Sequence, residues 1–293
     1  MTELEITRDE VIERSKALPG FPLVIKQIIA TIDDPEAGTE MLAGHIRHDP
    51  VIAARVLALA NAAATGTRRQ TSTHDIFTAA SLIGMNRVRE MALLVGVSGF
   101  VDDIAPVGTA TSFWKHSVAV GVCSEELALH TTAPASASAA LIAGLLHDVG
   151  QLWLYRFRGE SFSTTWTHAL GHAVAIEQAE RESYGADHST VGAWLAEHWA
   201  LPANIVAAIR CHHAPDTELA EPLVPVVHVA EVLSNALDLT DREENRVTSV
   251  STAACKALAL TWDESARALF GRMEARSRHA NALFGVQPGG TNP

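Results

Sequence analysis

One apolar stretch in the middle of the chain, residues 141–155, contains an imidazole and a carboxylate side by side, His147 and Asp148. Burying such a pair in a hydrophobic helix is costly unless another group binds it. A divalent metal ion satisfies both side chains, because it binds a neutral imidazole nitrogen and a carboxylate oxygen alike. Neighbouring residues on a helix point about 100° apart, so both can reach one ion from the same turn. The rest of the chain is therefore expected to bring further ligands to this pair.

The spacing of apolar residues predicts an all-α fold, a bundle of many helices. Ala and Leu are abundant and aromatic residues make up only 5% of the chain, which favours helices over sheet. No segment shows the period-two alternation of a half-buried strand. The chain has 293 residues, 47% hydrophobic and 19% charged, as expected of a soluble globular protein with one extended helical domain or two lobes.

Charge and cysteine content restrict the class of partner and the compartment. The net charge of −12 argues against binding to DNA or to anionic membranes. Three distant cysteines without a CxxC pair suit the reducing cytoplasm. The acidic N-terminus is not a signal peptide, and the longest uncharged stretch, 127–146, contains Pro134, which argues against a membrane span.

Helix start and stop signals divide the chain into elements. Thr7, Asp49 before Pro50, Thr73 and Asp187 are predicted N-caps, Gly84 is a predicted stop, and Thr261 with Glu264 fits a capping box. Residues 285–293 are expected to be disordered. The predicted helices are 1–17, 23–32, 39–47, 51–64, 74–83, 87–97, 113–129, 141–155, 166–184, 188–199, 203–213, 223–239 and 262–283.

Histidines and carboxylates at helix positions form a candidate metal centre. Four or five such groups around one or two ions would satisfy side chains otherwise stranded in an apolar bundle. Two ions would lie about 3.5–4 Å apart, with Asp148 as the natural bridge. The alternative is a set of hydrogen-bonded core histidines. The predicted metal ligands are His116, His147, Asp148, His188, His212, His213 and Glu231.

The other histidines are interpreted as core or exposed residues. His168 and His172 lie four residues apart, but nothing nearby completes a site, so exposure is expected. His228 is left open between a ligand and a hydrogen-bonded core residue. The remaining ones are His45, His48, His74, His130, His198 and His279.

Two blocks of sequence resemble the HDOD family, a branch of the HD/PDEase superfamily of helical metal proteins. The first runs from His48-Asp49-Pro50 through Arg55 to Asn61 and continues in residues 79–89 with Gly84 and Arg87. The second comprises Gly144-Leu-Leu-His147-Asp148-Val-Gly150, then 184–192 with His188, then Leu201-Pro202 and His212-His213. The resemblance covers residues 18–215. It implies an N-terminal helical lobe at 18–100 and an HD-like lobe at 105–215, preceded by the helix of 1–17 and followed by a helical extension at 216–284.

The resemblance implies an output or regulatory module of bacterial signalling. Many family members have lost their metal ligands, whereas this chain keeps the positions that match ligands of the related HD-GYP cyclic-di-GMP phosphodiesterases. It departs from those enzymes at Gln151, where they have Lys, at Glu231, where Asp is expected, and after His213, where no GYP motif follows. Gln151 offers a neutral amide in place of a cation for a substrate phosphate, so the metal site is expected to be better preserved than phosphate binding.

Three functions are expected in decreasing order. The first is a regulatory module that acts on signalling proteins, with a structural or sensory metal centre and no catalytic residue beyond Asp148 as metal bridge. The second is a metal-dependent phosphodiesterase or phosphohydrolase with a phosphoester or nucleotide ligand, and the third is a metal-free docking fold. The cofactor is one or two divalent ions, Fe, Mn, Zn or Ni. The C-terminal extension is expected to pack on the second lobe and complete the site through Glu231, and Arg55, Asn61 and Arg87 are expected to make caps and hydrogen bonds between helices rather than bind a partner.

Overall fold

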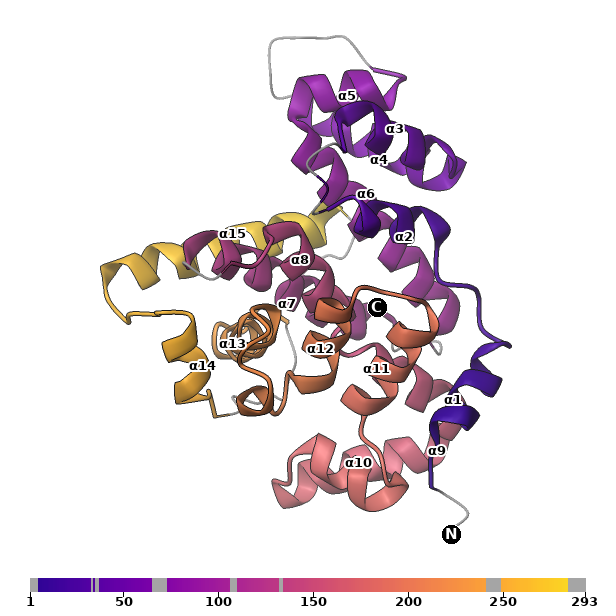
Figure 1. The fold of residues 1–293 in the computed structure, drawn as a ribbon, viewed down its shortest axis with the longest axis vertical. Coiled ribbons are helices and arrows are strands. Elements are labelled where there is room, and N and C mark those ends of the chain that lie inside the picture. Colours follow the sequence, from indigo (N-terminus) through magenta and orange to yellow (C-terminus); the bar gives the residue numbers. More distant parts are fainter. Residues whose placement is uncertain are drawn as a thin grey trace, which may run out of the picture. The chain divides into compact units, whose positions relative to one another are not determined.

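The computed structural model describes residues 5–32, 34, 37–64, 73–105, 110–131, 134–240 and 249–283, and every regular element within these ranges is a helix (Figure 1). The prediction of an all-α fold is confirmed. The elements are α1 (Arg8–Ser15), α2 (Leu23–Ala30), α3 (Thr39–Arg47), α4 (Pro50–Ala64), α5 (Ile76–Ile83), α6 (Met85–Ile104), α7 (Ala110–His130), α8 (Ala137–Leu146), α9 (Val149–His172), α10 (Ile176–Tyr184), α11 (His188–His198), α12 (Ala203–Cys211), the 3₁₀ helix η1 (Pro215–Thr217), α13 (Leu223–Ala236), α14 (Thr252–Ala257) and α15 (Glu264–Leu283).

The chain forms two compact units, Gly20–Asp103 and a larger one made of Met1–Pro19 with Ile104–Pro293. In the smaller unit α3, α4 and α5 pack on one another, and Ile25, Ile28 and Ile46 are fully buried. The rings of Phe21 and Phe100 meet edge to face at 5.2 Å. This unit therefore has a hydrophobic core of its own.

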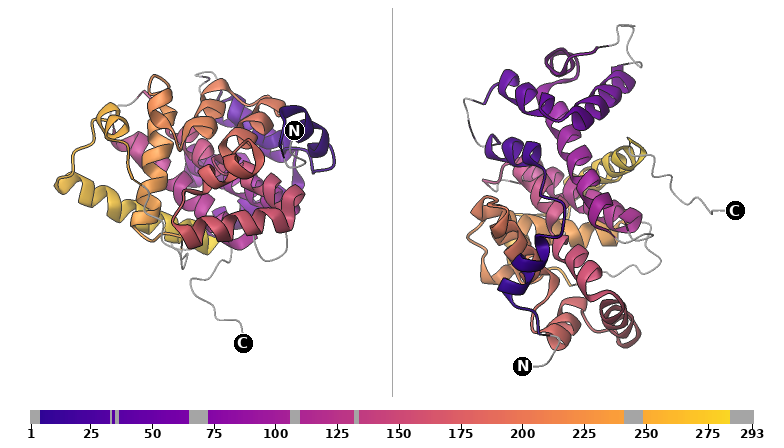
Figure 2. Two further views of the ribbon diagram at one scale, coloured as in Figure 1. Left: turned by 90° about the horizontal axis from the view of Figure 1, so that it is seen from below. Right: turned by 90° about the vertical axis from the view of Figure 1, so that its right-hand side faces the viewer.

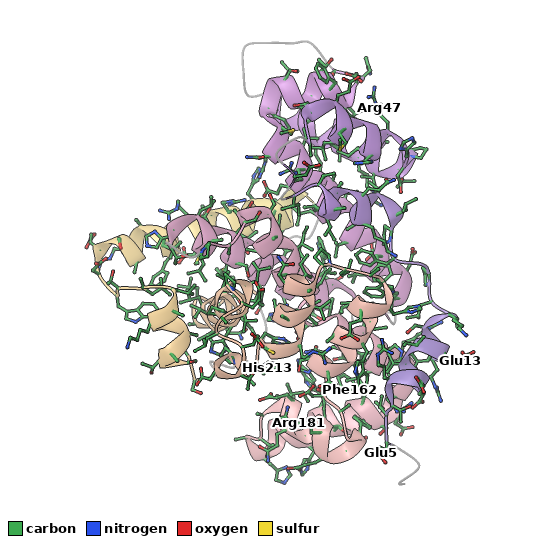
Figure 3. The ribbon with its side chains drawn as sticks, in the orientation of Figure 1. Glu5, Glu13, Arg47, Phe162, Arg181 and His213 are labelled. Atoms are coloured by element: carbon green, nitrogen blue, oxygen red, sulfur yellow. The ribbon has the colours of Figure 1, made fainter. Side chains whose placement is uncertain are left out.

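The larger unit is organised around α7, which packs on α8, α13 and α15, while α11 packs on α1, α9 and α12 (Figure 2). Its interior is filled by side chains such as Phe162, which is fully buried (Figure 3). A Cβ atom added to Gly144 on α8 would lie 2.7 Å from the Cα of Gly121 on α7. The two helices thus approach at backbone distance, which places the C-terminal end of α8 beside α7.

The segment 141–155, predicted to be one helix, is two helices that meet at His147 and Asp148. Asp148 has φ −97° and ψ 10°, and its carbonyl accepts the N–H of Gln151 at 2.8 Å, a turn three residues long. This geometry interrupts the α-helical hydrogen bonds at the His147-Asp148 pair. The prediction of a continuous helix is wrong, because periodicity alone does not detect a one-turn break between two buried helices.

Several predicted caps are confirmed and others are wrong. Thr7, Asp49 and Asp187 accept the backbone N–H groups expected of N-caps. Gly84 ends α5 with φ +91°, which an L side chain rarely adopts. Asp75, and not Thr73, caps α5 by accepting the N–H of Thr78.

At the other end of the chain, Asp263 replaces the capping box predicted for α15. The helix predicted at 166–184 divides at Ala173, whose φ is +54°, into α9 and α10. Helix α14 was not predicted. The tail at 285–293, expected to be disordered, lies outside the described residues.

Within the described part of the chain, one helical stretch, Ala137–His172, is long and apolar enough to span a membrane by length and hydropathy. In the fold, 89% of its most apolar window is buried. Its apolar side chains are part of the hydrophobic core of the larger unit.

Candidate metal centre

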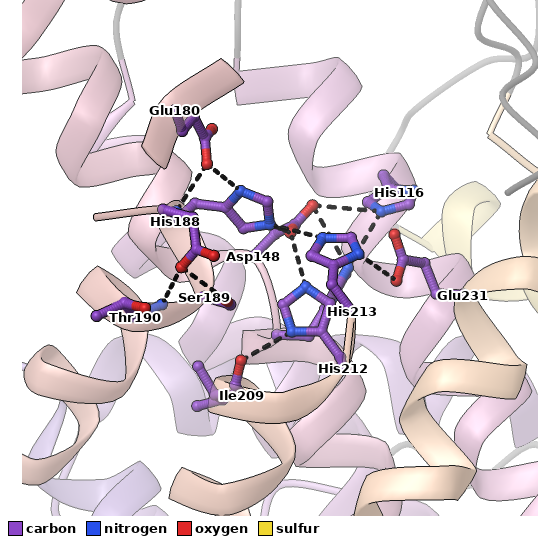
Figure 4. A network of polar contacts seen from close by, with 12 residues as sticks. His116, Asp148, Glu180, His188, Ser189, Thr190, Ile209, His212, His213 and Glu231 are labelled. Atoms are coloured by element: carbon purple, nitrogen blue, oxygen red, sulfur yellow. Dashed lines mark hydrogen bonds and ion pairs between the residues drawn. The ribbon is translucent and has the colours of Figure 1, made fainter. Parts of the chain in front are cut away.

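The structure brings all of the predicted ligand residues into one buried cluster in the larger unit (Figure 4). They come from helices α7, α11 and α13 and from the turns that end α8 and α12. The cluster has two groups, and within each group one ligand atom per residue lies within 4.8 Å of the others. One group is Asp148, His188, His212 and His213, and the other is His116, His147 and Glu231.

Asp148 lies at the centre and links the two groups. Its Oδ2 is 3.4 Å from the Nε2 atoms of both His116 and His147. Its Oδ1 is 3.2 Å from Nε2 of His188 and 3.7 Å from Nε2 of His212. Each carboxylate oxygen therefore faces a different set of imidazoles, which is the arrangement of a bridging ligand.

Backbone carbonyls fix the orientation of two of the rings. Nδ1 of His147 lies 2.8 Å from the carbonyl oxygen of Gly144, and Nδ1 of His212 lies 2.8 Å from that of Ile209. A carbonyl only accepts, so in both rings Nδ1 carries the proton and donates it. In the neutral ring Nε2 then carries a lone pair and faces Asp148. Metal-binding histidines are oriented in the same way, by a hydrogen bond from the other ring nitrogen.

Glu180 on α10 orients the third ring and was not predicted as a site residue. Its Oε2 accepts the backbone N–H of His188 at 2.7 Å and the Nδ1–H of the same residue at 2.6 Å. Both side chains are fully buried. The sequence places Glu180 on an acidic helix face, yet it lies four residues before Tyr184, a buried residue, and this spacing was the available signal.

Imidazole nitrogens and carboxylate oxygens therefore converge on one small volume. Nε2 of His188 lies 2.9 Å from Nε2 of His213, and Nε2 of His147 lies 3.2 Å from Nε2 of His116. Among the described residues neither Asp148 Oδ1 nor His212 Nε2 has a hydrogen bond. Several imidazole nitrogens and a carboxylate thus share a buried volume in which two of these atoms lack a hydrogen bond, so the donor set fits a divalent metal ion.

The electrostatics of the cluster agree with a cation site. Burial alone would raise the pKa of Asp148, but the neighbouring histidines, His147 foremost, hold it well below its usual range. Burial alone would lower the pKa of His188, but Glu180 and Asp148 raise it well above its usual range. A proton on His188 therefore balances the Asp148 charge when no metal is bound, and a metal would displace it.

Two residues mark the edge of the cluster that reaches solvent. The side chains of His147, His188 and Asp148 are 0%, 0% and 3% exposed, whereas those of His213 and Glu231 are 14% and 10% exposed. Burial lowers the pKa of His213 well below its usual range and raises that of Glu231 to about 7. Nδ1 of His213 and Oε2 of Glu231 lie 3.8 Å apart, too far for a hydrogen bond.

The remaining candidate residues have structural roles or face solvent. The side chain of Asn61 makes two hydrogen bonds to the backbone of Thr73. Its Oδ1 accepts the N–H at 2.8 Å, and its Nδ2 donates to the carbonyl oxygen at 3.0 Å. Arg87 pairs with Glu90 on its own helix at 2.6 Å, and Arg55 is exposed. The surface histidines His168 and His172 are exposed, as expected.

Known proteins share this fold. A crystal structure of an HDOD domain protein of unknown function from Geobacter sulfurreducens superimposes with a TM-score of 0.76 at 23% identity, covering 94% of this chain and 98% of that one. One from Shewanella amazonensis SB2B, described as a candidate phosphohydrolase, gives 0.70 at 22% identity with the same coverage. One from Marinobacter aquaeolei VT8, described as a candidate signal transduction protein, gives 0.71 at 21% identity, covering 97% of this chain and 62% of that one.

Sequence comparison places the likeness within a family. An uncharacterized protein of Treponema pallidum (strain Nichols) is 25% identical over 241 residues, which are 78% of this chain and 44% of that protein, so the chain spans less than half of its relative. The model of the HDOD domain matches residues 18–215, which include most of the cluster and leave Glu231 beyond them. The chain therefore belongs to the HDOD family.

Proposed function

We propose that the protein is a regulatory module of bacterial signalling that acts by binding other proteins, and that its buried metal centre has a structural or sensory role. The observation that carries the proposal is that imidazole Nε2 atoms converge on the carboxylate of Asp148. The side chains concerned are almost wholly buried. A site of this kind ties distant helices together once a cation is bound.

The residues divide into two sets of ligands for one or two ions. His116, His147 and Glu231, with Oδ2 of Asp148, would hold one ion, and His188, His212 and His213, with Oδ1 of Asp148, would hold the other. A bound divalent ion supplies Lewis acidity and fixed geometry. Mixed imidazole and carboxylate ligands suit Fe, Mn, Zn or Ni.

Burial and charge favour a regulatory role over catalysis. Only the edge at His213 and Glu231 reaches solvent, and neither side chain exceeds 14% exposure. Gln151, three residues after Asp148 and buried, carries no charge for a substrate phosphate. A phosphoester would therefore meet a nearly closed site without the cation that related hydrolases place there.

The alternative is a metal-dependent phosphodiesterase or phosphohydrolase with a cyclic dinucleotide or another phosphoester as substrate. The presence of all seven candidate ligands favours it, because a bound divalent ion supplies the Lewis acidity that hydrolysis of a phosphoester needs. The Shewanella relative described as a candidate phosphohydrolase adds support from the fold. In this function the residues at the exposed edge, His213 and Glu231, would meet the substrate.

Partners and compartment are part of the same proposal. Signalling proteins of the bacterial cytoplasm are the expected partners, which the description of the Marinobacter relative as a candidate signal transduction protein supports. The three cysteines are unpaired, as suits a reducing compartment. The net charge of −12 argues against DNA and anionic membranes as partners.

Metal content and turnover, measured on the same preparations, test the proposal. The purified chain is analysed for Fe, Mn, Zn and Ni and assayed with each metal against cyclic di-GMP and a generic phosphodiester. Asp148→Ala and His147→Ala are the test variants, and His172→Ala, at an exposed position, is the matched control. Stoichiometric metal without turnover supports the regulatory module. Turnover lost in both test variants and kept in the control supports the hydrolase, and absence of metal from the wild type contradicts both.

A further inference from the structure

We infer that His228 is a positioning residue that couples helix α14, in the C-terminal extension, to the His212–His213 pair of the metal centre. The inference rests on the proposed metal centre. It assigns to the extension a role beyond the contribution of Glu231: the docking of α14 and the binding of metal are linked events.

Both ring nitrogens of His228 have defined partners. Nδ1 lies 2.7 Å from the carbonyl oxygen of His212, and Nε2 lies 3.0 Å from the backbone nitrogen of Ser251. A carbonyl can only accept and a peptide N–H can only donate. The ring is therefore neutral with its proton on Nδ1, and it bridges a metal-site residue and the start of α14.

Ser251 connects α14 to the same region by a second route. Its hydroxyl accepts the N–H of Ala254 at 3.0 Å, so Ser251 is the N-cap of α14, and it donates to Oδ1 of Asp216 at 2.5 Å. Asp216 follows His213 by three residues and lies in η1. The start of α14 is thus tied both to the chain just after the histidine pair and, through His228, to the carbonyl of His212.

Helix α13 contacts the His212–His213 pair through two of its side chains. His228 and Glu231 are three residues apart and lie on one face of the helix. Glu231 lies beside the ring of His213, while His228 holds the backbone of His212. If α14 leaves, Nε2 of His228 loses the N–H that fixes its ring, and the anchor on His212 is weakened.

Linkage makes the coupling reciprocal. If docked α14 raises metal affinity by some factor, bound metal must favour docking of α14 by the same factor. Helix α14 lies beyond residues 18–215, the part matched by the HDOD model. A molecule that draws α14 away would therefore weaken metal binding at His212 and His213, and loss of metal would make α14 easier to draw away.

The test is hydrogen exchange of peptides from 249–260 in the full chain, with and without Zn²⁺, together with Zn²⁺ affinity from a competing chelator. His228→Asn keeps a donor near the position of Nδ1 and loses the acceptor for Ser251, whereas His228→Gln keeps an acceptor near Nε2 and loses the donor for His212. In the wild type Zn²⁺ should slow exchange in 249–260. In both variants this protection should disappear, and the affinity should fall about tenfold, the lower end of the effect of residues that support metal ligands.

A cap variant and its control separate coupling from misfolding. Ser251→Ala keeps the backbone N–H and removes the cap and the bond to Asp216, so it should also weaken Zn²⁺ binding. The control is Thr7→Ala, which removes the Thr7 hydroxyl that accepts the N–H of Glu10 and caps α1. This variant should leave Zn²⁺ affinity unchanged. Exchange in α9 reports whether each variant is folded.

The outcomes distinguish this inference from the proposed function. A wild type without metal overturns both. A wild type that binds metal, but whose 249–260 peptides do not respond to it, overturns the coupling alone. Protection in His228→Asn and His228→Gln equal to that of the wild type, or an Nε2–H tautomer of His228 by ¹⁵N NMR, does the same.

Discussion

Glu180 is not one of the proposed ligands, yet it determines which nitrogen of His188 faces Asp148. One oxygen, Oε2, holds both the backbone and the side chain of His188. A fully buried carboxylate is tolerated only when it is paired and hydrogen-bonded, and here the partner is the imidazole that it orients. Removing its charge should therefore affect metal binding more than folding.

Substitution of Glu180 by Gln tests this. The amide retains the shape and one acceptor, but lacks the charge that makes His188 a stronger ligand, so metal affinity should fall about 10–100-fold. A competing chelator titration measures the loss. Glu182→Gln, two residues along the same helix and exposed, is the matched control and should bind metal as the wild type does. Equal affinities of Glu180→Gln and wild type would show that His188 needs no such support.

At this scale sequence reasoning found the residues whose chemistry is unusual for their surroundings. His147 and Asp148 interrupt an apolar stretch, so their burial could be predicted, and the structure places them in the cluster. Glu180 has acidic neighbours, Glu177 and Glu182, and nothing in its local composition separates it from a solvated face. Its role depends on the packing of α10 against α9 and α11, which only the tertiary structure reveals.

At the scale of elements, close contact between helix backbones positions the ligands. A Cβ atom added to Gly150 on α9 would lie 2.0 Å from the carbonyl oxygen of His188 and 2.6 Å from the backbone nitrogen of Gly192 on α11. The helix that begins after Asp148 therefore touches the backbone of the helix that begins with His188. A side chain at position 150 would therefore push the start of α9, next to Asp148, away from the start of α11, where His188 lies.

Gly150→Ala should accordingly damage stability and metal binding together. Forcing a methyl group into backbone contact costs about 3 kcal/mol. Denaturant unfolding and metal titration measure the two effects. Gly171→Ala, later on α9 with no atom within 4 Å of the added Cβ, is the control and should lose neither stability nor metal, because Ala favours a helix over Gly. A Gly150→Ala protein that binds metal normally would mean that α9 and α11 can separate without moving their ligands.

Helix α15 is held on α7 by charged contacts that depend on pH. The carboxylate of Glu126 accepts from Arg272 and Arg276, each at 2.8 Å. Burial alone would raise the pKa of Glu126, but the two arginines lower it below its ordinary value of 4.5. A carboxyl group with a lowered pKa in the folded state stabilises it fully above the ordinary value, and this stabilisation is lost as the pH falls through the lowered one.

The pH dependence of unfolding should therefore change in Glu126→Gln. The free energy of unfolding of the wild type should fall as the pH drops below about 4.5 by about 1 kcal/mol more than that of the variant, since these contacts are partly exposed. Denaturant midpoints across the acid range measure it. Glu274→Gln, on α15 with an exposed partner 3.9 Å away, is the control and should follow the wild type. If the free energies of unfolding of Glu126→Gln and wild type fell equally with pH, Glu126 would not be the cause of the loss of stability in acid.

The elements themselves could mostly be predicted from sequence, and their breaks could not. Apolar periodicity and caps such as Asp187 are local, so they could be read correctly. The turn at His147 and Asp148 and the break at Ala173 lie inside continuous apolar or amphipathic patterns, where period and composition do not change. At the first break Gly150 touches the backbone of α11, a contact that is absent from any local window. At the second, Ala173 adopts a left-handed conformation, which favours glycine, so its sequence does not signal the end of a helix.

At the scale of the whole molecule, the described chain has two cores and the candidate metal centre belongs to one of them. All of the proposed ligands lie in the unit of Met1–Pro19 with Ile104–Pro293, and none in Gly20–Asp103. A ligand that binds only the folded state stabilises by RT ln(1 + [L]/Kd), about 4 kcal/mol at a thousandfold excess over Kd. That stabilisation should therefore act on one unit.

Removal of the metal should consequently affect the two units differently. After treatment with a chelator, hydrogen exchange should accelerate in peptides from α7, α8, α11 and α13, because the cation that would link these helices is then missing and local opening becomes easier. Peptides from α3, α4 and α5 should exchange at the same rate with and without metal. Restored protection after Zn²⁺ is added back, and none in Asp148→Asn, would tie the effect to the cluster. Equal acceleration in both units would show instead that the metal stabilises the chain as one cooperative body, and equal rates throughout would show that no ion holds these helices together.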